Sequence, residues 1–462
     1  MGSERMVVIG GDAAGMTAAS QARRLRDPAD LRITAFERGG ATSYSACGIP
    51  YWIAGTVAAR ADLIARTPEQ HRANAVDVHL HHEVTRIDLE SRVVTVQDID
   101  GGRELQEPFD TLVYATGATP LRPPVPGIDA PGVYGVQVLE DGAVLRAELE
   151  SGRVRRVVVV GAGYIGLEMA EACRIRGLEV TVVDRAKTPM STFDPDMGGV
   201  VAEAAEGMGI HLVMGETVSA FATGPDGRVA AVHTEAGTEL PADLVVLGLG
   251  VRPNVALAEQ AGIALGPSGG IAVDSRMRTS APGVWAAGDC VESPHRLTGQ
   301  SVVIALGTHA NKQGRVAGIN IGGGYAEFAG VIGTAVTKVC DLELARTGLS
   351  TQEAGAAGLP YVTAQVDSTT RAGYFPGAKP IRIKVIAEKG SGRLLGAQIV
   401  GRQESAKRID VFATAIWNGM TVEEILSMDL SYAPPFSPVW DPVLIAARKT
   451  QDAVVADLRR TG

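Results

Sequence analysis

Cysteine is scarce in this chain, whose 462 residues include only Cys47, Cys173, Cys290 and Cys340. Their spacing gives neither a CxxC pair nor a disulfide framework of the kind found in small secreted proteins. This pattern favours a reducing compartment, so we expect a cytoplasmic protein without a metal site. The segment ATSYSACGIPYW has Thr42 and Ser43 where a second cysteine would be needed. Any disulfide that Cys47 forms must therefore involve an outside thiol.

Surplus positive charge and long apolar runs are also missing. The 43 Lys and Arg against 52 Asp and Glu give a formal charge of -9, which disfavours nucleic acid and anionic membranes because phosphate repels such a surface. No apolar stretch approaches the roughly 20 residues that span a bilayer. The start, MGSERMVVIGG, lacks the basic region, apolar core and cleavage site of a signal peptide. We expect small-molecule substrates and neither nucleic-acid nor membrane partners.

Glycine, by contrast, is plentiful, with 56 residues in a chain that is 45% hydrophobic. Two segments repeat one plan of strand, glycine turn and helix: RMVVIGGDAAGMTAASQARRL and RVVVVGAGYIGLEMAEACRIRGLEVTVVD. Runs of valine and isoleucine indicate strands buried on both faces, and the following stretches have helical spacing. The sequence therefore predicts two nucleotide-binding units in an α/β chain too long for one core.

Changes in composition and residue pattern along the chain predict the domain boundaries. A cluster of prolines from Pro120 to Pro131 marks the first crossing. After about residue 245, LVVLGLGVRPN and TSAPGVWAAGDC are expected to be strands that return to the first sheet. From about 330, strand-like PIRIKVIAE and LLGAQIVG precede the helical RIDVFATAIWNGMTVEEIL. The predicted fold class is α/β, with two Rossmann-like domains at 1–120 plus 246–329 and at 121–245, and a C-terminal α+β domain at 330–462.

The second glycine turn is the clearer nucleotide motif. Gly161, Gly163 and Gly166 follow a valine strand and open a helix, which lets the backbone approach a pyrophosphate at the positive end of that helix. Asp184 follows Gly166 by eighteen residues, at the end of the next strand. There its carboxylate is expected to bind ribose hydroxyls.

The first glycine turn departs from this pattern. Gly10, Ala14 and Gly15 fit it, but Asp12 stands where the middle glycine would sit. Glu37 ends the next strand as a ribose acceptor should. Thr116 and Gly117 in TLVYATGATP, and Asp289 in GVWAAGDC, are further candidates for nucleotide contact. Asp289 taken alone reads equally well as a helix cap, whereas together these segments favour a bound flavin.

The order of the motifs GGxAAG, acidic strand end, ATG, GAGYIGLE and AAGD resembles the FAD-dependent pyridine nucleotide-disulphide oxidoreductases over essentially the whole chain. SQARRL, SxxxC-GIPY, AGYFPGAKP and YAPPFSPVWDP are similar to the single-cysteine branch, which contains coenzyme A disulfide reductases, persulfide reductases and NAD(P)H oxidases. The resemblance implies FAD in 1–120 and 246–329, NADH or NADPH in 121–245, coenzyme A as a candidate substrate, and a homodimer closed by 330–462.

Cys47 is predicted to be the redox residue. Gly48 and Pro50 suit the first turn of a helix, whose unpaired N–H groups and dipole would lower the thiol pKa and favour the attacking thiolate. The other three cysteines are expected to be inert. Cys173, for example, lies inside the apolar stretch EMAEACRI.

The resemblance also implies substrate residues. Gln21 and Arg24 in SQARRL would hold the polar end of coenzyme A, with Ser43 beside the thiol, although the pair alone reads as the solvated end of a surface helix. The segment YAPPFSPVWDP lacks the histidine base of dithiol reductases. Tyr432 is therefore the candidate proton donor across the dimer, with Tyr374 shaping the same pocket, unless Tyr432 merely packs the interface.

Three functional hypotheses stay open at this level. The first is a reductase that passes electrons from NAD(P)H through FAD to a mixed disulfide on Cys47. The second is an NAD(P)H oxidase that reduces oxygen to peroxide or water, although Ala13 occupies the place where many water-forming relatives carry a histidine. The third is a non-catalytic, redox-sensing flavoprotein. For the coenzyme, Asp184 favours NADH, whereas Arg185 and Lys187 would suit the extra phosphate of NADPH.

Overall fold

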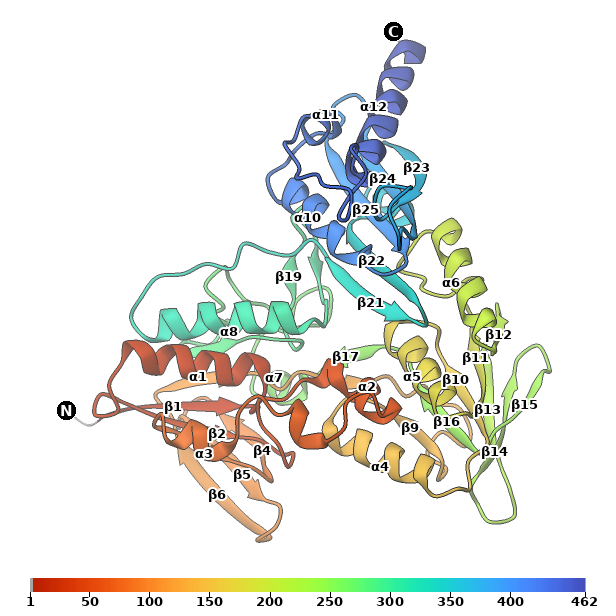
Figure 1. Cartoon of the computed structure of the whole chain (residues 1–462). Coiled ribbons are helices and arrows are strands. Elements are labelled where there is room, and N and C mark those ends of the chain that lie inside the picture. The colour runs from red at the N-terminus through yellow and green to blue at the C-terminus, as the bar shows by residue number, and fades with distance from the viewer. Residues whose placement is uncertain (1–2, 462) are drawn as a thin grey trace.

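A parallel sheet carries the first glycine loop in the computed structural model, which describes residues 3–461. Its apolar strands are almost fully buried, and each pairs in parallel with its neighbours. Helix α1 (Ala13–Leu25) packs along α8 (Gly307–Ile321) beside this sheet (Figure 1). The strands in spatial order are β18 (Val284–Ala286), β7 (Thr111–Tyr114), β1 (Glu4–Ile9), β2 (Leu31–Phe36) and β3 (Val76–His79).

A second parallel sheet carries the second glycine loop. Its strands in spatial order are β12 (Ile210–Met214), β11 (Glu179–Asp184), β10 (Arg156–Val160), β16 (Leu244–Leu247) and β9 (Val133–Gly135). The longer helices of this unit are α4 (Leu139–Glu150), α5 (Tyr164–Ile175) and α6 (Pro195–Gly207). The prediction that LVVLGLG returns to the first sheet is wrong, because β16 pairs with β10. The later run, GVWAAGDC, does return there as β18.

Smaller elements connect the two parallel sheets. Strands β8 (Ala118–Pro120) and β17 (Val251–Pro253) form an antiparallel pair. This pair joins the two chain segments that cross from one parallel sheet to the other. The remaining strands of these units are β4 (His82–Asp88), β5 (Val93–Asp98), β6 (Arg103–Pro108), β13 (Val218–Thr223), β14 (Val229–Thr234), β15 (Glu239–Pro241), β19 (Ser293–Pro294) and β20 (Ser301–Val302). The short helices are α2 (Ile49–Ala54), α3 (Pro68–Arg72), α7 (Ala256–Gln260), and the 3₁₀ turns Ala46–Gly48 and Arg60–Leu63.

The C-terminal part is an antiparallel sheet with helices, as predicted. Its strands in spatial order are β21 (Ala335–Val339), β22 (Leu342–Gly348), β25 (Leu394–Gly401), β24 (Pro380–Glu388) and β23 (Tyr361–Thr369). Its helices are α9 (Thr351–Ala356), the 3₁₀ turn Ala406–Arg408, α10 (Ile409–Trp417), α11 (Val422–Leu426) and α12 (Pro442–Thr461). In Figure 1 this domain stands above the two nucleotide-binding units, with β21 reaching down between them.

A buried ionic cluster ties the C-terminal sheet to α6. Lys384 Nζ lies 2.9 Å from Asp194 Oδ2 and 2.8 Å from both carboxylate oxygens of Asp196. The Asp194 amide donates to Gln398 Oε1 at 2.9 Å, and the Asp194 residue is only 2% exposed. Lys384 and Asp194 are withdrawn from water, whereas the Asp196 side chain is 46% exposed. The attraction between Lys384 and Asp194 is therefore weakly screened and depends on both partners being present.

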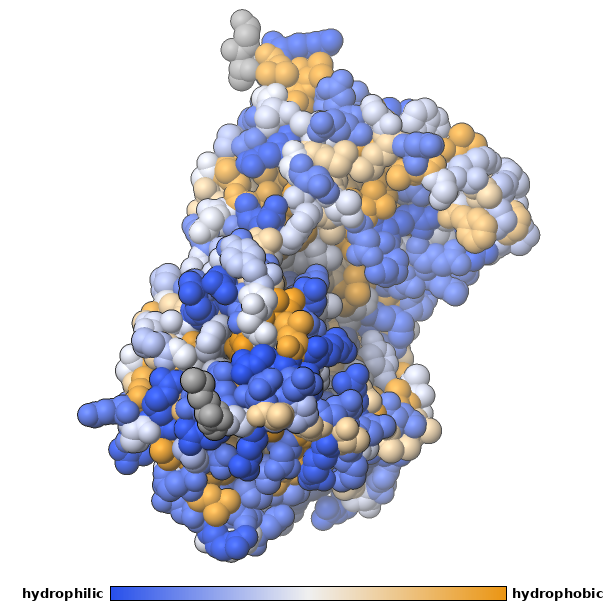
Figure 2. Space-filling view, turned by 90° about the vertical axis from the view of Figure 1, so that its left-hand side faces the viewer, coloured by the Kyte–Doolittle hydropathy of each residue, from blue (hydrophilic) through white to orange (hydrophobic). Residues whose placement is uncertain are grey.

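The face of the molecule in Figure 2 is mostly hydrophilic, interrupted by smaller apolar areas. Large exposed hydrophobic side chains are frequent on the C-terminal domain, where Tyr374 is 78% exposed, Phe436 73% and Val439 68%. Across residues 3–461, none of the helices has the length and apolar character that crossing a membrane requires.

Replacing Lys384 tests the ionic cluster. Lys384→Met should lower the free energy of unfolding by about 3 kcal/mol, because it leaves the buried Asp194 carboxylate without its cation. Thermal unfolding followed by circular dichroism measures the loss. Lys389→Met is the matched control, since the Lys389–Asp457 pair is more exposed and exposed pairs contribute about 1 kcal/mol or less. Equal melting temperatures for the two variants would contradict the assignment.

Candidate active site

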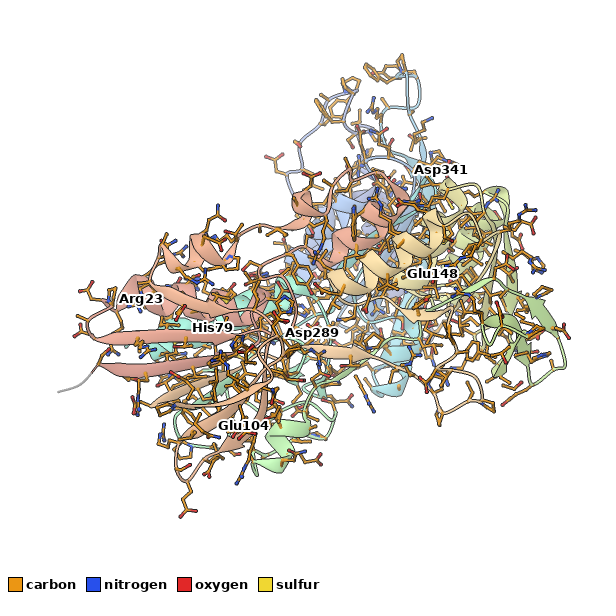
Figure 3. All side chains as sticks on the ribbon, turned by 90° about the horizontal axis from the view of Figure 1, so that it is seen from below. Arg23, His79, Glu104, Glu148, Asp289 and Asp341 are labelled. Carbon is orange, nitrogen blue, oxygen red and sulfur yellow. The ribbon has the colours of Figure 1, made fainter. Side chains whose placement is uncertain are left out.

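One cavity of about 2680 Å³ joins the two glycine loops to Cys47. Its walls come from the carboxyl ends of β1, β2, β10 and β11, from the start of α8, and from β21. Figure 3 shows Asp289, another lining residue, near the middle of the molecule between the first sheet and the helices of the second unit. The cavity is large enough for two nucleotides, and it opens at the sheet edges where such ligands bind in α/β proteins.

Both glycine loops are held by the same close backbone approach. A Cβ on Gly15 would lie 2.0 Å from the carbonyl oxygen of Gly10, and one on Gly166 would lie 1.9 Å from that of Gly161. Gly10 and Gly161 also have φ near +104° and +108°, which side chains other than glycine rarely tolerate. Four glycines predicted from the motifs are therefore sterically required. Gly163 differs, because nothing lies within 4 Å of its Cβ position, so this side of the loop is open.

The two acidic strand ends point back to these loops. Glu37 Oε2 accepts a hydrogen bond from the Gly11 amide at 2.8 Å, and Asp184 Oδ2 accepts one from the Ala162 amide at 2.6 Å. Each carboxylate is thus fixed beside the turn that would hold a pyrophosphate, where it can accept hydrogen bonds from a ribose. Both line the cavity.

Thr116 and Gly117 form a turn at the cavity wall, and Asn254 fixes it. The Asn254 side-chain amide donates to the Thr116 carbonyl at 2.8 Å, and the Asn254 backbone carbonyl accepts from Thr116 Oγ1 at 2.8 Å. The Asn254 amide donates to the Gly117 carbonyl. The sequence analysis missed Asn254, although its place in GVRPN, just after a predicted strand, was the available signal.

Asp289 presents a carboxylate that makes no hydrogen bond within the described residues. Burial raises its pKa to about 6, so it is charged at neutral pH and suited to accept hydrogen bonds from ligand hydroxyls. The preceding Gly288 amide donates to Gln313 Oε1 at 2.8 Å, which fixes this turn against α8. The free Asp289 carboxylate and the open space beside Gly163 are suited to a site that holds a nucleotide-bearing flavin and a second nucleotide.

Cys47 lies in the 3₁₀ turn Ala46–Gly48, just before α2, with Pro50 in the first turn of that helix. Its side chain is exposed, but to the cavity that it lines. Burial in these walls, followed by the Glu168, Asp289 and Asp12 carboxylates, raises the thiol pKa. The expectation of a lowered pKa is therefore wrong, because burial and three acidic side chains outweigh the dipole of α2, which has only six residues.

The other cysteines are less accessible. Cys173 and Cys290 are fully buried in apolar clusters, and burial raises the pKa of each to about 12. Cys340 is partly buried on the turn between β21 and β22, where burial and Glu171 raise its pKa to about 11. Cys47 is the exposed thiol among the four.

The candidate substrate residues on α1 lie outside the cavity wall. Arg24 is exposed and donates to Gln21 Oε1 at 3.3 Å, so its guanidinium keeps donors free for a ligand. Neighbouring Arg23 is a structural residue, because it donates to the backbone carbonyls of Arg26, Leu31 and Ala75.

Ser43 lies four residues before Cys47 and pairs with a histidine. Its Oγ is 3.0 Å from His71 Nε2, and its backbone has φ +50°. His71 is 2% exposed, and burial lowers its pKa, so the imidazole is neutral at pH 7. This pair is absent from the sequence expectations because the partners are far apart in the chain.

Tyr374 and Tyr432 lie together on the C-terminal domain, away from the cavity of their own chain. They are 78% and 47% exposed, and neither lines the cavity. Desolvation and the neighbouring Tyr374 hydroxyl raise the pKa of Tyr432. Within one chain, these tyrosines are therefore not brought to Cys47.

Glu168 on α5 is a cavity residue that the sequence analysis did not select. It accepts a hydrogen bond from Thr337 Oγ1 at 2.5 Å, which links α5 to β21, and burial raises its pKa. Tyr164, at the start of the same helix, has a buried hydroxyl without a hydrogen-bond partner in residues 3–461. Both belong to the segment GYIGLE, so the helical spacing of its polar residues was the available signal.

Comparison with known proteins gives matches along nearly all of the chain. The sequence profile described as pyridine nucleotide-disulphide oxidoreductase matches residues 4–314, and the corresponding dimerisation-domain profile matches residues 334–442. The NAD(P)H sulfur oxidoreductase (CoA-dependent) of Pyrococcus furiosus is 40% identical over 450 residues, covering 97% of this chain and 99% of the relative. The NADH oxidase of Methanocaldococcus jannaschii is 39% identical over 445 residues, covering 96% and 98%. The structure of an NAD-dependent persulfide reductase from A. fulgidus has 41% identity and a TM-score of 0.93, covering 99% of this chain and 84% of the other.

The environment of Cys47 predicts a thiol that ionises late. In the reduced protein, its alkylation by iodoacetamide should rise with pH through a midpoint above about 8.5, the ordinary thiol value, since burial and nearby carboxylates oppose the thiolate. Peptide mass spectrometry after timed labelling measures the rate at this residue. A midpoint below neutral pH would show that the helix start dominates instead.

Proposed function

Because the chain belongs to the pyridine nucleotide-disulphide oxidoreductase family, we propose that it uses NAD(P)H to reduce a disulfide or persulfide of a small thiol such as coenzyme A. FAD and a nicotinamide coenzyme are the cofactors of this family, and bound FAD supplies the hydride and electron chemistry. The observation that carries the proposal is the exposure of Cys47 to the cavity that both glycine loops line. The similarity to a CoA-dependent sulfur oxidoreductase and to a persulfide reductase supports the substrate class.

In this proposal each nucleotide has its own set of residues. Residues 1–120 and 246–329 bind FAD and residues 121–245 bind NAD(P)H, with β16 completing the sheet of the latter. The residues assigned to FAD are Gly10, Ala14, Gly15, Glu37, Thr116, Gly117 and Asp289. Those assigned to the coenzyme are Gly161, Gly163, Gly166 and Asp184. The hydrogen bonds that fix Glu37, Asp184 and the 116–117 turn support this division.

Cys47 provides the sulfur chemistry. Its thiolate attacks a substrate disulfide, forms a new S–S bond and releases one substrate thiol. Two electrons from NAD(P)H and a proton then break the mixed disulfide, which regenerates the Cys47 sulfur and releases the second thiol. The free state of all four cysteines supports this use of an outside thiol, and it supports a cytoplasmic location.

In this proposal, residues on α1, outside the cavity wall, bind the polar end of the substrate. Arg24 has a free guanidinium, whose planar donors match phosphate oxygens, and Gln21 lies beside it. Ser43 would meet the substrate closer to Cys47. We propose Gln21, Arg24 and Ser43 as contacts for a coenzyme A moiety.

The C-terminal domain is proposed to form a homodimer. Its exposed Tyr374, Phe436 and Val439 provide an apolar surface of the kind that a second copy would cover. The dimerisation-domain match over residues 334–442 supports this. In such a dimer, Tyr432 of one chain would donate a proton near Cys47 of the other, with Tyr374 beside it.

Oxygen reduction is the second candidate function. The similarity to an archaeal NADH oxidase at 39% identity favours it. Ala13 offers no imidazole in the first glycine loop, so peroxide rather than water is the expected product of this route.

Cys47→Ser tests the leading proposal. It should retain bound FAD, because Cys47 is not among the residues assigned to the cofactor, but reduce coenzyme A disulfide at least about 100-fold more slowly, because the attacking sulfur is gone. Thiol release under excess NADH measures the rate, and flavin absorbance measures cofactor retention. Cys340→Ser is the control and should behave as wild type.

Two rates separate the candidate functions. Oxygen uptake and thiol release are measured on the same preparation at equal NADH. Thiol release that far exceeds oxygen uptake supports the reductase. Oxygen uptake alone, unchanged in Cys47→Ser, would replace that proposal with an oxidase.

Coenzyme preference follows from charge at the end of β11. Asp184 accepts ribose hydroxyls but repels a 2′-phosphate, and Glu216 and Glu235 line the same cavity. Of the two cations that follow Asp184, Arg185 lines this cavity and Lys187 does not. NADH should therefore be at least as good a substrate as NADPH. Initial rates with each coenzyme measure kcat/KM. Asp184→Asn should reduce the difference in kcat/KM between NADH and NADPH. A strong NADPH preference in the wild type would contradict this assignment.

The proposed homodimer leads to a separate prediction. Light scattering should give twice the 48.1 kDa of one chain, and Tyr432→Phe should slow thiol release about tenfold or more by removing the proposed proton donor without changing the mass. A fully active monomer would exclude a role for the second copy, and an unimpaired Tyr432→Phe dimer would reduce Tyr432 to a packing residue.

A further inference from the structure

Asp12 gives the first glycine loop a charged side chain, which the second loop lacks. The loops share sterically required glycines, and each has an amide bound to the acidic residue that ends the next strand. At the middle position the second loop has Gly163, which leaves open space, whereas the first has a carboxylate that lines the cavity. A negative charge beside an anion site is unfavourable, so its presence calls for a compensating role.

The contacts of this loop identify that role. Asp12 Oδ1 accepts a hydrogen bond from the Tyr44 amide at 3.2 Å. The neighbouring Gly11 carbonyl accepts from Thr42 Oγ1 and, at 3.2 Å, from the Ser43 amide. Although Asp12 precedes α1, its side chain makes no capping hydrogen bond to that helix. Its carboxylate is therefore directed to the segment that leads into Cys47.

That segment depends on such anchors because it has little regular structure of its own. Between β2 and the turn Ala46–Gly48 it forms only an isolated bridge, between Tyr44 and Ile64. On its other side the Ala65 amide donates to the Ser43 carbonyl at 2.8 Å, and the Ser45 amide donates to the Leu63 carbonyl at 2.8 Å. Residues 42–45 are thus held between the glycine loop and residues 63–65, and Asp12 is the side chain that binds the Tyr44 amide.

The charge of the Asp12 carboxylate also acts on the Cys47 sulfur. Burial, with help from Glu37 and Asp289, raises the pKa of Asp12 to about 6, so its carboxylate is ionised at neutral pH. The acidic groups that face Cys47 are Glu168 from α5, Asp289 from the turn after β18 and Asp12 itself, and each disfavours the thiolate. Burial raises the pKa of Tyr51 on α2 to about 12, with help from Glu168, Glu171 and the Cys47 charge.

We propose that Asp12 is a positioning residue for Cys47: its carboxylate holds the Tyr44 amide, and with it the segment that presents the thiol to the cavity, and it adds a negative charge to the cavity that the thiol lines. The inference rests on the proposed redox role of Cys47. It gives a function to the side chain that replaces the middle glycine of the first loop. The two effects are separable, because asparagine keeps a carbonyl acceptor without the charge, whereas alanine removes both.

The test uses the full-length, FAD-containing protein, reduced and then freed of reductant. Cys47 alkylation by iodoacetamide is followed by peptide mass spectrometry from pH 5.5 to 10, and hydrogen exchange is followed in residues 42–48. Asp12→Asn should move the alkylation profile to lower pH by about 0.5 unit with exchange unchanged. Asp12→Ala should move the profile likewise and speed exchange about tenfold, the loss expected for one charge-assisted hydrogen bond.

Glu216→Gln is the matched control, since Glu216 lines the cavity but does not bind the Cys47 segment, and it should leave both readouts at wild-type values. An unchanged profile in Asp12→Asn overturns the electrostatic part, and unchanged exchange in Asp12→Ala overturns the anchoring part. If Asp12→Ala loses its flavin absorbance, Asp12→Asn and Asp12→Ser, which retain an acceptor, decide the question. Neither readout requires turnover, so failure here is distinguishable from failure of the disulfide-reductase proposal, which the Cys47→Ser rate decides.

Discussion

Two close backbone approaches shape the glycine loops that line the cavity. In each nucleotide-binding unit the first helix starts so near the preceding turn that a single added carbon would collide with a carbonyl oxygen, at Gly15 as at Gly166. This contact fixes where α1 and α5 begin, and hence where their amide groups point. It also sets the distance to the acidic residue on the next strand, so that Glu37 and Asp184 reach the loop amides. Two copies of one steric constraint thus build two sites that face a common space.

Local patterns in the sequence predicted the features that depend on neighbouring residues. The required glycines, the acidic strand ends and the separate C-terminal domain all follow from spacing and composition. The affiliation of β16 did not, because its residues, LVVL, are equally apolar in either sheet and only pairing with β10 assigns them. Asn254 and His71 were not predicted from the sequence, for a similar reason. Each acts on a turn that is distant in the chain, so no periodicity connects the partners.

The acidity of Cys47 shows how tertiary surroundings can override a local motif. Gly48 and Pro50 do begin a helix, as expected, but the helix is short and its dipole acts on a sulfur surrounded by carboxylates from three other segments. Burial of the sulfur and these carboxylates outweigh that dipole, so the pKa of the Cys47 thiol is raised.

The cluster around Lys384 has a mechanical consequence. It joins α6 of the unit that carries the second glycine loop to the C-terminal sheet, while Thr337 of that same sheet is bonded to α5. The two contacts lie on different helices. A rotation of that unit against the C-terminal domain would therefore break at least one of them.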